Sequence, residues 1–265
     1  MIKLLAVDMD GTLLDENSQI PPETHGLIRE LREAGVRFAV SSGRNHPSLV
    51  EFWGETAPYI DYIASNGTQV VCDGKVLENV AFDRDALVRL KEVCDRVDCL
   101  HLLCLTADRH YIMELDWELT GPPPGEVEYE SRATEVPYDP IFKVVVVNER
   151  EQDISDILFA LSHEVGDCLK FLPYTARAID VMPNDVSKAT GLEAMRTYLG
   201  IEREEIAAYG DSMNDYEMMR YAGSPRAMSN ACYVLRAFAD EILGSNAEHA
   251  VQKDMQRIID EARGA

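Results

Sequence analysis

Two acidic segments, each directly after an apolar run, carry side chains suited to chemistry. The first is Asp8–Thr12 (DMDGT), which follows the apolar residues 2–7. Side chains at i and i+2 of an extended segment point the same way, so we expect the carboxylates of Asp8 and Asp10 to share one strand end. Two like charges there raise each other's proton affinity unless a cation lies between them. The hydroxyl of Thr12 can orient a neighbouring group.

Ordinary interpretations compete for this first segment. Asp and Gly are common turn residues, so the segment can be a simple turn. A calcium-binding EF-hand loop is excluded, because its sixth and twelfth positions need Gly and Glu, whereas Leu13 and Gln19 stand there.

The second acidic segment is Gly210–Asp215 (GDSMND), which follows the strand-like residues 206–209. It adds the carboxylates of Asp211 and Asp215 and the carboxamide of Asn214. Taken alone, it can equally be a turn that caps the next helix, with Asp211 or Asn214 at the N-cap.

Two further positions offer groups that bind anions. Lys188 stands at the start of a predicted helix, where a lone lysine is usually only solvated. Ser42 and Gly43 lie between a strand and a helix, so a hydroxyl and backbone amides can meet an anion at a helix N-terminus. A plain N-cap explains that pair as well, if it is taken alone.

The elements around these residues predict how they are positioned. Apolar runs at 2–7, 36–40 and 59–64 alternate with helical patterns at 22–34 and 46–54. Such alternation predicts a Rossmann-like α/β core, with a parallel sheet, helices on both faces and a site at the carboxyl ends of the strands. The same pattern resumes in helix 187–199 and strand 206–209.

Between these parts, residues 83–185 read as an inserted α+β block with helices at 84–97 and 151–163. We therefore predict a discontinuous core, 1–82 and 186–265, with a second domain inserted at 83–185.

All four positions then meet at one edge of the predicted sheet. Carboxylates suit a hard cation, whereas serine, lysine and amides suit an anion. Mg²⁺ prefers oxygen ligands and pairs with phosphate. Without a cation, phosphate would approach bare carboxylates, so this interpretation requires a divalent metal.

Composition narrows the class of protein. The 265 residues include 25 Lys and Arg against 47 Asp and Glu, a formal charge of −22. That balance, without a basic cluster, argues against nucleic acid and anionic membranes as partners. We expect a cytoplasmic protein without a membrane span, since no apolar run is long enough. The six cysteines fit neither zinc nor iron–sulfur spacings and are expected to be free thiols.

The ordered set of motifs resembles the haloacid dehalogenase superfamily of hydrolases, in its Cof-like IIB branch, over essentially the whole chain. Asp8–Thr12 resembles motif one, Ser41–Arg44 motif two, Lys188 motif three and Gly210–Asp215 motif four. The chain departs from the family at Ser229, where the family usually has Gly.

This resemblance implies catalytic and metal-binding roles. Asp8 is the implied nucleophile, which forms an aspartyl-phosphate, and Asp10 is the implied general acid and base. Mg²⁺ is the implied cofactor, held by Asp8, by Asp10 through its backbone carbonyl, and by Asp211. Asp215 supports the metal site.

The resemblance also implies how substrate is held. The implied phosphate ligands are Ser42, Lys188, Asn214 and the backbone amides of Met9 and Gly43. Arg44 would offset part of the negative charge of the carboxylates and the phosphate. Asn66 would lie near the substrate. The inserted block is the implied cap over the site. Its candidate contacts are Met113, Trp117, Tyr138, Phe142, Lys143, Tyr174 and Arg177, although core packing or solvation explains most of them equally well.

The expected function is a Mg²⁺-dependent phosphatase that acts on a small phosphorylated metabolite, such as a sugar phosphate. Two alternatives stay open. One is a phosphomutase on the same core, and the other is a non-catalytic ligand-binding member of the family.

Overall fold

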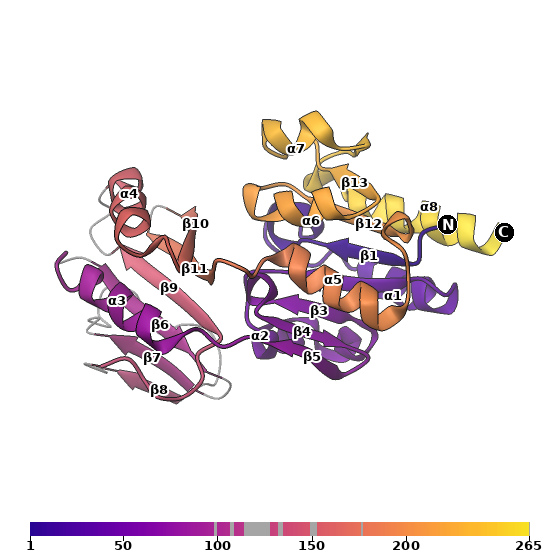
Figure 1. Cartoon of the computed structure of the whole chain (residues 1–265). Coiled ribbons are helices and arrows are strands. Elements are labelled where there is room, and N and C mark those ends of the chain that lie inside the picture. Colours follow the sequence, from indigo (N-terminus) through magenta and orange to yellow (C-terminus); the bar gives the residue numbers. More distant parts are fainter. Residues whose placement is uncertain are drawn as a thin grey trace. The chain divides into compact units, whose positions relative to one another are not determined.

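The chain folds into two compact units, which Figure 1 colours along the sequence. The computed structural model describes residues 1–97, 100–106, 109–113, 128–131, 135–148, 153–175 and 177–264. The first unit comprises Met1–Glu78 and Ser187–Ala265, and the second comprises Asn79–Val186. The first segment of the first unit ends with a strand absent from the sequence prediction, β5 (Lys75–Asn79), which lies at the edge of the first sheet.

The first unit is built on an eight-stranded sheet in the order β14-β13-β12-β1-β2-β3-β4-β5. Its parallel strands are β1 (Leu4–Val7), β2 (Arg37–Ser41), β3 (Asp61–Ala64), β12 (Ile206–Gly210), β13 (Ser224–Ala227) and β14 (Glu241–Ile242). In the centre, Val7 pairs with Val40 on one side and Tyr209 on the other. The carboxyl ends of β12, β1 and β2 therefore meet at one edge, as predicted.

One edge of this sheet is antiparallel, which corrects the expectation of a purely parallel core. β4 (Gln69–Cys72) pairs antiparallel with β3, and β5 lies beside β4. Asp73 and Gly74 link β4 to β5 with φ angles of 52° and 70°. An Asp-Gly pair with two positive φ angles is typical of a tight hairpin turn, so this dipeptide is the signal that the sequence analysis overlooked.

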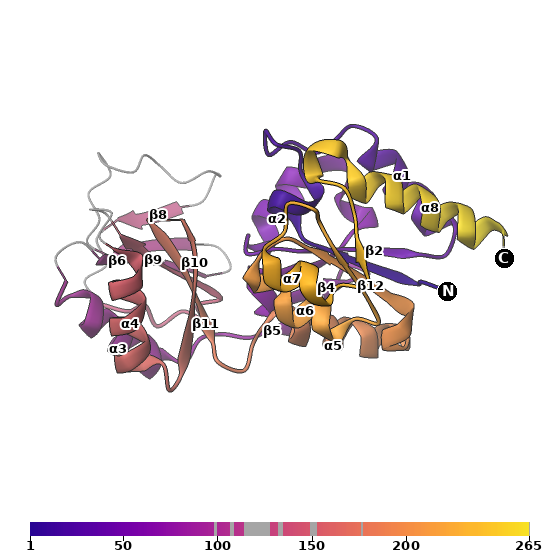
Figure 2. The same ribbon diagram turned by 90° about the horizontal axis from the view of Figure 1, so that it is seen from above.

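Helices cover both faces of the sheet, as predicted (Figure 2). On one face lie α1 (Thr24–Glu33), α2 (His46–Trp53) and α8 (Ala250–Gly264); on the other lie α5 (Lys188–Leu199), α6 (Tyr216–Tyr221) and α7 (Tyr233–Phe238). Strand β1 is wholly buried between these layers, which explains its continuous apolar run. Short helical turns connect the elements: η1 (Met9–Leu13), η2 (Gly54–Tyr59), η3 (Ser65–Gly67), η4 (Arg203–Glu205), η5 (Met213–Asp215) and η6 (Asn246–Glu248).

The second unit is an α+β domain with its own core. Its sheet has the order β10-β11-β9-β6-β7-β8, where the strands are β6 (Leu100–Leu105), β7 (Arg109–Met113), β8 (Glu128–Ser131), β9 (Lys143–Asn148), β10 (Leu169–Thr175) and β11 (Ala178–Pro183). Helices α3 (Arg84–Cys94) and α4 (Ile154–Val165) pack on the sheet and on each other. The fold class predicted from the sequence, a Rossmann-like core with an α+β insertion, is thereby confirmed.

The candidate contacts in this unit have ordinary structural surroundings. Phe142 is buried, and Lys143 forms an ion pair with Asp180 at 3.0 Å. Tyr138 is exposed and lies against the guanidinium of Arg84. Arg177 is exposed as well. Trp117 and the side chains of Met113 and Tyr174 lie outside the described part.

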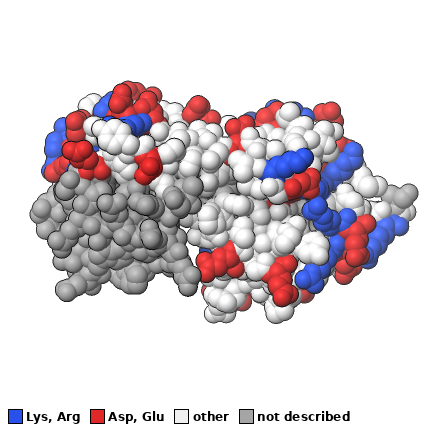
Figure 3. Space-filling model, turned by 90° about the horizontal axis from the view of Figure 1, so that it is seen from below, with Lys and Arg blue, Asp and Glu red and all other residues white. Residues whose placement is uncertain are grey.

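On the face drawn in Figure 3, basic side chains of the described residues lie among acidic ones. The ion pairs Arg263–Glu30 and Arg257–Glu241 also bring opposite charges together.

Burial holds three of the thiols in the protonated form. Cys72, Cys94 and Cys104 are buried, and desolvation raises the pKa of each thiol to about 12. Cys99 lies outside the described residues. Among the described helices, none is long and apolar enough to cross a membrane.

Candidate active site

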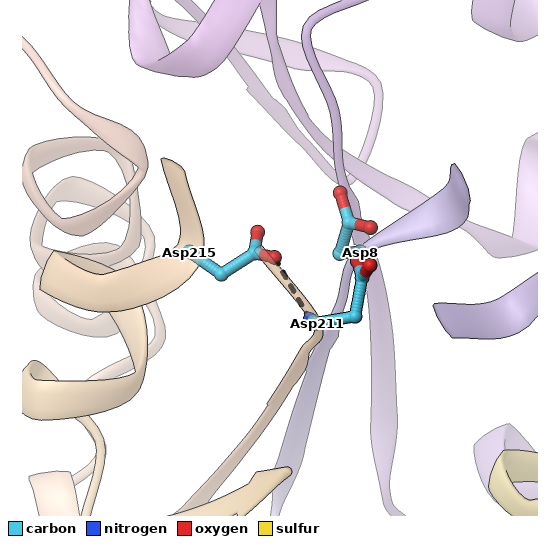
Figure 4. A group of neighbouring side chains, drawn as sticks. All are labelled: Asp8, Asp211 and Asp215. Atoms are coloured by element: carbon cyan, nitrogen blue, oxygen red, sulfur yellow. Dashed lines mark hydrogen bonds between the residues drawn. The ribbon is translucent and has the colours of Figure 1, made fainter. Parts of the chain in front are cut away.

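Three carboxylates converge at the carboxyl edge of the first sheet. Asp8 directly follows β1, Asp211 directly follows β12, and Asp215 ends the short turn η5. Each contributes a carboxylate oxygen to a group whose members all lie within 4.8 Å of one another. Figure 4 shows the Asp215 carboxylate pointing toward the other two. Neighbouring parallel strands thus bring together residues that are far apart in the sequence.

Lys188, which lies on the other side of the second unit from Asp8 in the sequence, joins this cluster. Its ammonium donates a hydrogen bond of 2.6 Å to Oδ1 of Asp8 and another of 2.6 Å to Oδ1 of Asp215. The side chain is completely buried. Lys188 is the first residue of α5, whose start is fixed by a capping box between Ser187 and Thr190. It is therefore a buried, partnered cation and not the solvated lysine of the ordinary interpretation.

The cluster carries an excess of buried negative charge. Burial, followed by the charge of Asp215, raises the pKa of Asp8 well above its usual value, although Lys188 opposes that rise. Burial and Asp215 likewise raise the pKa of Asp211 to about 6. Burial opposes the charge of Lys188, but the carboxylates of Asp215 and Asp8 outweigh it and raise the pKa of the ammonium. One lysine thus leaves the three carboxylates only partly compensated.

Asp215 uses both of its oxygens inside the protein. Oδ1 accepts from Lys188, while Oδ2 accepts from the backbone N–H groups of Asp211 (3.1 Å) and Ser212 (3.2 Å). Gly210 leaves the room that this arrangement needs, because a Cβ there would lie 2.5 Å from the Cβ of Asp215. Asp215 therefore positions both the lysine and the loop that carries Asp211.

Asp8 and Asp10 occupy different environments, although both have extended backbone angles. The Asp8 side chain is 8% exposed, whereas that of Asp10 is 57% exposed. The Asp10 carboxylate accepts a hydrogen bond of 2.8 Å from Arg44, whose guanidinium lies over the ring of Phe52. The two carboxylates thus follow the same strand, as expected, but burial separates the closed position of Asp8 from the open position of Asp10.

The Ser42 loop is tied to the turn that follows β3. The N–H of Ser42 donates to the carbonyl of Ile63, and the Ser42 carbonyl accepts from the N–H of Asn66, both at 2.9 Å. The N–H of Ser65 donates to the carbonyl of Arg44 at 2.8 Å. Ser42 and Asn66 are both buried. The structure therefore places the two predicted substrate-binding segments directly side by side.

The same turn touches the start of α5. Gly67 has a φ of +109°, and a Cβ on it would lie 2.1 Å from the carbonyl oxygen of Ser187. A glycine is thus required where the turn meets the residue before Lys188. Sequence analysis singled out Asn66 here but not this close approach, for which the Asn-Gly dipeptide is the available signal.

The remaining predicted residues line the loops on either side. Thr12 donates from its hydroxyl to Oδ1 of Asp211 at 3.3 Å, which is the orienting contact expected of it. Met9 is fully buried behind Asp8, and Gly43 is half-buried beside Ser42. Asn214 accepts a hydrogen bond of 3.2 Å from the hydroxyl of Ser212.

A divalent cation fits the donor set of this cluster. Oδ1 of Asp8 accepts from Lys188 and Oδ1 of Asp211 accepts from Thr12, and each carboxylate keeps oxygen lone pairs for a hard cation. Burial and neighbouring negative charge raise the pKa of both carboxyl groups. A bound cation would offset that negative charge.

Comparisons with known proteins match most of the chain. A family model described as haloacid dehalogenase-like hydrolase matches residues 5–255. The chain is 29% identical over 263 residues to the Escherichia coli protein named 5-amino-6-(5-phospho-D-ribitylamino)uracil phosphatase YbjI, covering 97% of this chain and 96% of that protein. A Bacillus subtilis protein with the same phosphatase name, YitU, is 24% identical, with 94% and 95% covered.

Solved structures show the same fold. SMU.1108c from Streptococcus mutans superposes with a TM-score of 0.85 at 20% identity, over 98% of this chain and 100% of that one. The subclass IIB sugar phosphatase BT4131 superposes with a TM-score of 0.77 at 18% identity, over 97% and 98%.

The family model and the relatives named as phosphatases together indicate an enzyme of the phosphatase class. The chain belongs to the haloacid dehalogenase-like hydrolases.

Proposed function

We propose that this protein is a Mg²⁺-dependent phosphatase that hydrolyses a small phosphorylated metabolite through an aspartyl-phosphate on Asp8. The observation that carries the proposal is the buried Lys188 ammonium, held 2.6 Å from both Asp8 and Asp215 beside the carboxylate of Asp211. A lysine and three carboxylates at one sheet edge can hold a phosphoryl group and the cation that it needs.

Asp8 is placed to attack. It is buried, its Oδ1 is fixed by Lys188, and its Oδ2 can meet phosphorus in line with the leaving oxygen. The Oδ2–phosphorus bond forms while the bond from phosphorus to the ester oxygen breaks. Lys188 and Ser42 then hold the equatorial oxygens, where negative charge accumulates.

Asp10 is placed to move the proton. Its exposed carboxylate can reach both a leaving oxygen and an incoming water, and Arg44 orients it. As an acid it gives a proton to the departing alcohol. As a base it then takes a proton from the water that hydrolyses the phosphoaspartate.

The metal would be held by Asp8 and Asp211, and Asp215 would fix the loop that carries Asp211. When bound, Mg²⁺ would neutralise charge on the phosphoryl oxygens and on the crowded carboxylates. A cation there also explains how a phosphate dianion can approach this site.

The substrate class rests on the curated relatives and stays coarser than a single compound. Two of them are named as phosphatases of 5-amino-6-(5-phospho-D-ribitylamino)uracil, so this polyol phosphate stands first in the substrate panel. Sugar phosphates follow. The role expected of the inserted unit, to cover the site and recognise the leaving group, stays a prediction.

The decisive experiment measures release of inorganic phosphate from p-nitrophenyl phosphate and from the metabolite panel, with Mg²⁺ or with EDTA. We expect turnover that depends on Mg²⁺ and that falls by roughly 10³-fold or more in Asp8→Asn, because that substitution keeps the shape but removes the nucleophile. Circular dichroism of the variant controls for folding.

Three outcomes would contradict the proposal. Activity of Asp8→Asn within about tenfold of the parent would exclude the covalent mechanism. Conversion of a sugar phosphate into its isomer without release of phosphate would indicate a phosphomutase. Absence of both Mg²⁺ binding and a beryllofluoride adduct on Asp8 would indicate a non-catalytic ligand-binding protein.

A further inference from the structure

The loop that carries Asp10 has backbone carbonyls that need partners. It leaves β1 after Val7 and closes into one wide turn, in which the N–H of Leu14 donates to the carbonyl of Met9 at 3.0 Å. The carbonyls of Gly11, Leu13 and Leu14 accept hydrogen bonds from side chains outside this turn. Such groups need other donors, because an unpaired backbone group costs free energy.

Three side-chain carboxamides supply those donors. Asn230 donates to the carbonyl of Gly11 at 2.8 Å, Gln252 to that of Leu13 at 3.1 Å, and Asn246 to that of Leu14 at 2.9 Å. We call this group the amide clamp: Asn230, Asn246 and Gln252.

The clamp comes from three separate segments of the C-terminal half. Asn230 lies between β13 and α7, Asn246 begins η6, and Gln252 lies in α8. Two of the three are linked, because the N–H of Asn246 donates to Oδ1 of Asn230 at 3.2 Å. Gln252 also donates to the hydroxyl of Thr24 at 3.0 Å. Asn230 and Asn246 are therefore a linked pair, and Gln252 holds the same loop through a separate contact.

Asn230 has the most direct contact with the catalytic loop. Gly11 also lies beside the acidic cluster, since a Cβ on it would be 2.5 Å from Oδ2 of Asp211. The φ of Gly11 is +80°. Gly11 thus contacts Asn230 through its carbonyl and adjoins Asp211, one residue after the proposed acid and base.

We propose that Asn230 is a positioning residue for Asp10: its carboxamide fixes the Asp10–Gly11 segment so that the Asp10 carboxylate meets the leaving oxygen. This inference rests on the proposed phosphatase function. A carboxamide suits the position, because its NH₂ donates to the Gly11 carbonyl while its oxygen accepts from the Asn246 N–H. Asn230 is itself exposed, so its replacement removes the clamp contact without opening the core.

The test compares Asn230→Ala and Asn230→Asp with the control Ser229→Ala. The aspartate keeps the shape and the acceptor but loses the donor to Gly11. The control alters the neighbouring residue, which is also exposed. For each variant, kcat/KM is measured on p-nitrophenyl phosphate and on the fastest alkyl phosphate of the panel. This parameter reports only the steps up to departure of the alcohol, where the acid acts.

We expect both Asn230 variants to lose about tenfold in kcat/KM on the alkyl phosphate and less than about twofold on p-nitrophenyl phosphate, since nitrophenolate leaves without a proton. Ser229→Ala should stay within about twofold of the parent on both. Equal losses on the two substrates, or no loss on either, would overturn the proposal, because a general structural effect does not depend on the leaving group.

A second measurement separates this inference from the phosphatase proposal. Amide hydrogen exchange over residues 9–14 should be faster in Asn230→Ala than in the parent, with α5 unchanged. Unchanged exchange in that segment would overturn the clamp, whatever the activity. Faster exchange in Asn230→Ala, combined with a parent protein that hydrolyses no phosphate ester, would overturn the proposed function and leave the clamp as a structural contact.

Discussion

The ammonium of Lys188 lies 2.6 Å from the carboxylate of Asp8, although 180 positions separate the two residues in sequence. Asp8 precedes the inserted unit and Lys188 follows it directly. The pair therefore forms only when both halves of the first unit have folded together, and the stability and chemistry of the site depend on the same contact.

Replacement of this lysine tests that dependence. Lys188→Met leaves Asp8 and Asp215 buried without their counter-charge, so we expect a loss of about 3–5 kcal/mol in the free energy of unfolding at pH 7.5. The loss should shrink toward pH 5, because the pKa of Asp8 is already raised and the carboxyl group protonates more readily. Urea denaturation at both pH values measures this, with Lys75→Met as the control for an exposed lysine. A deficit that is independent of pH would contradict the account.

Metal binding should depend on pH in a defined direction. An acid whose pKa is higher in the folded than in the unfolded chain stabilises the fold at low pH, and that contribution is lost as the pH rises through the folded value. Burial and Asp215 place the pKa of Asp211 at about 6, so the metal-free protein loses stability between about pH 4 and pH 6.

Mg²⁺ at a hundred times its Kd should therefore raise Tm by roughly 5 °C at pH 7.5 and by much less at pH 5. Thermal unfolding with Mg²⁺ or EDTA provides the measurement. Asp211→Asn is the control and should show a higher Tm than the parent in EDTA at pH 7.5, but no response to Mg²⁺. An equal response of the parent at both pH values would refute the assignment of the cation to this cluster.

The exposed position of Asp10 leads to a leaving-group prediction. Asp10→Asn removes the proton donor but leaves Asp8 and Lys188 in place, so kcat/KM should fall by roughly 10²-fold or more on an alkyl phosphate. On p-nitrophenyl phosphate the loss should be much smaller. Rapid-quench measurement of the first turnover compares the two substrates, and losses of equal size would exclude Asp10 as the acid.

Two glycines with positive φ angles allow a matched test of the turn beside Lys188. Gly67→Ala places a Cβ 2.1 Å from the Ser187 carbonyl, whereas Gly200→Ala has the same kind of backbone strain with open space around it. We expect both variants to lose about 1 kcal/mol of stability from strain and Gly67→Ala to lose more from the clash. Only Gly67→Ala should lower kcat, by about tenfold or more, because it displaces the start of α5. Equal activity in the two variants would show that the turn does not position Lys188.

Much of the fold was predictable because its signals are local. Wholly apolar strands, helical spacing and the position of Gly35 after α1 mark the elements, and the rule that sites form at the carboxyl ends of parallel strands places the acidic segments together. The pair β4 and β5 was missed because the outer strand β5 is mostly exposed and mixes polar with apolar residues. There the only strong signal was the Asp73-Gly74 turn.

Less of the site was predictable, because burial and long-range partners decide it. Nothing in the spacing of Asp8 and Asp10 distinguishes a buried carboxylate from an exposed one; the difference arises from the packing of α5 and from the contact with Arg44. The clamp residue Asn230 carries no local signal at all. Its function depends on a carbonyl 219 positions away.

The place of Ser187 has a practical consequence for chimeric proteins. This residue is at once the first one after the insertion, the N-cap of α5 and the neighbour of Gly67. A graft that exchanges residues 79–186 for another insert must therefore keep its downstream junction ahead of Ser187. Moving that junction even one residue further would remove the serine that caps the start of α5, the helix whose first residue, Lys188, pairs with the buried carboxylate of Asp8.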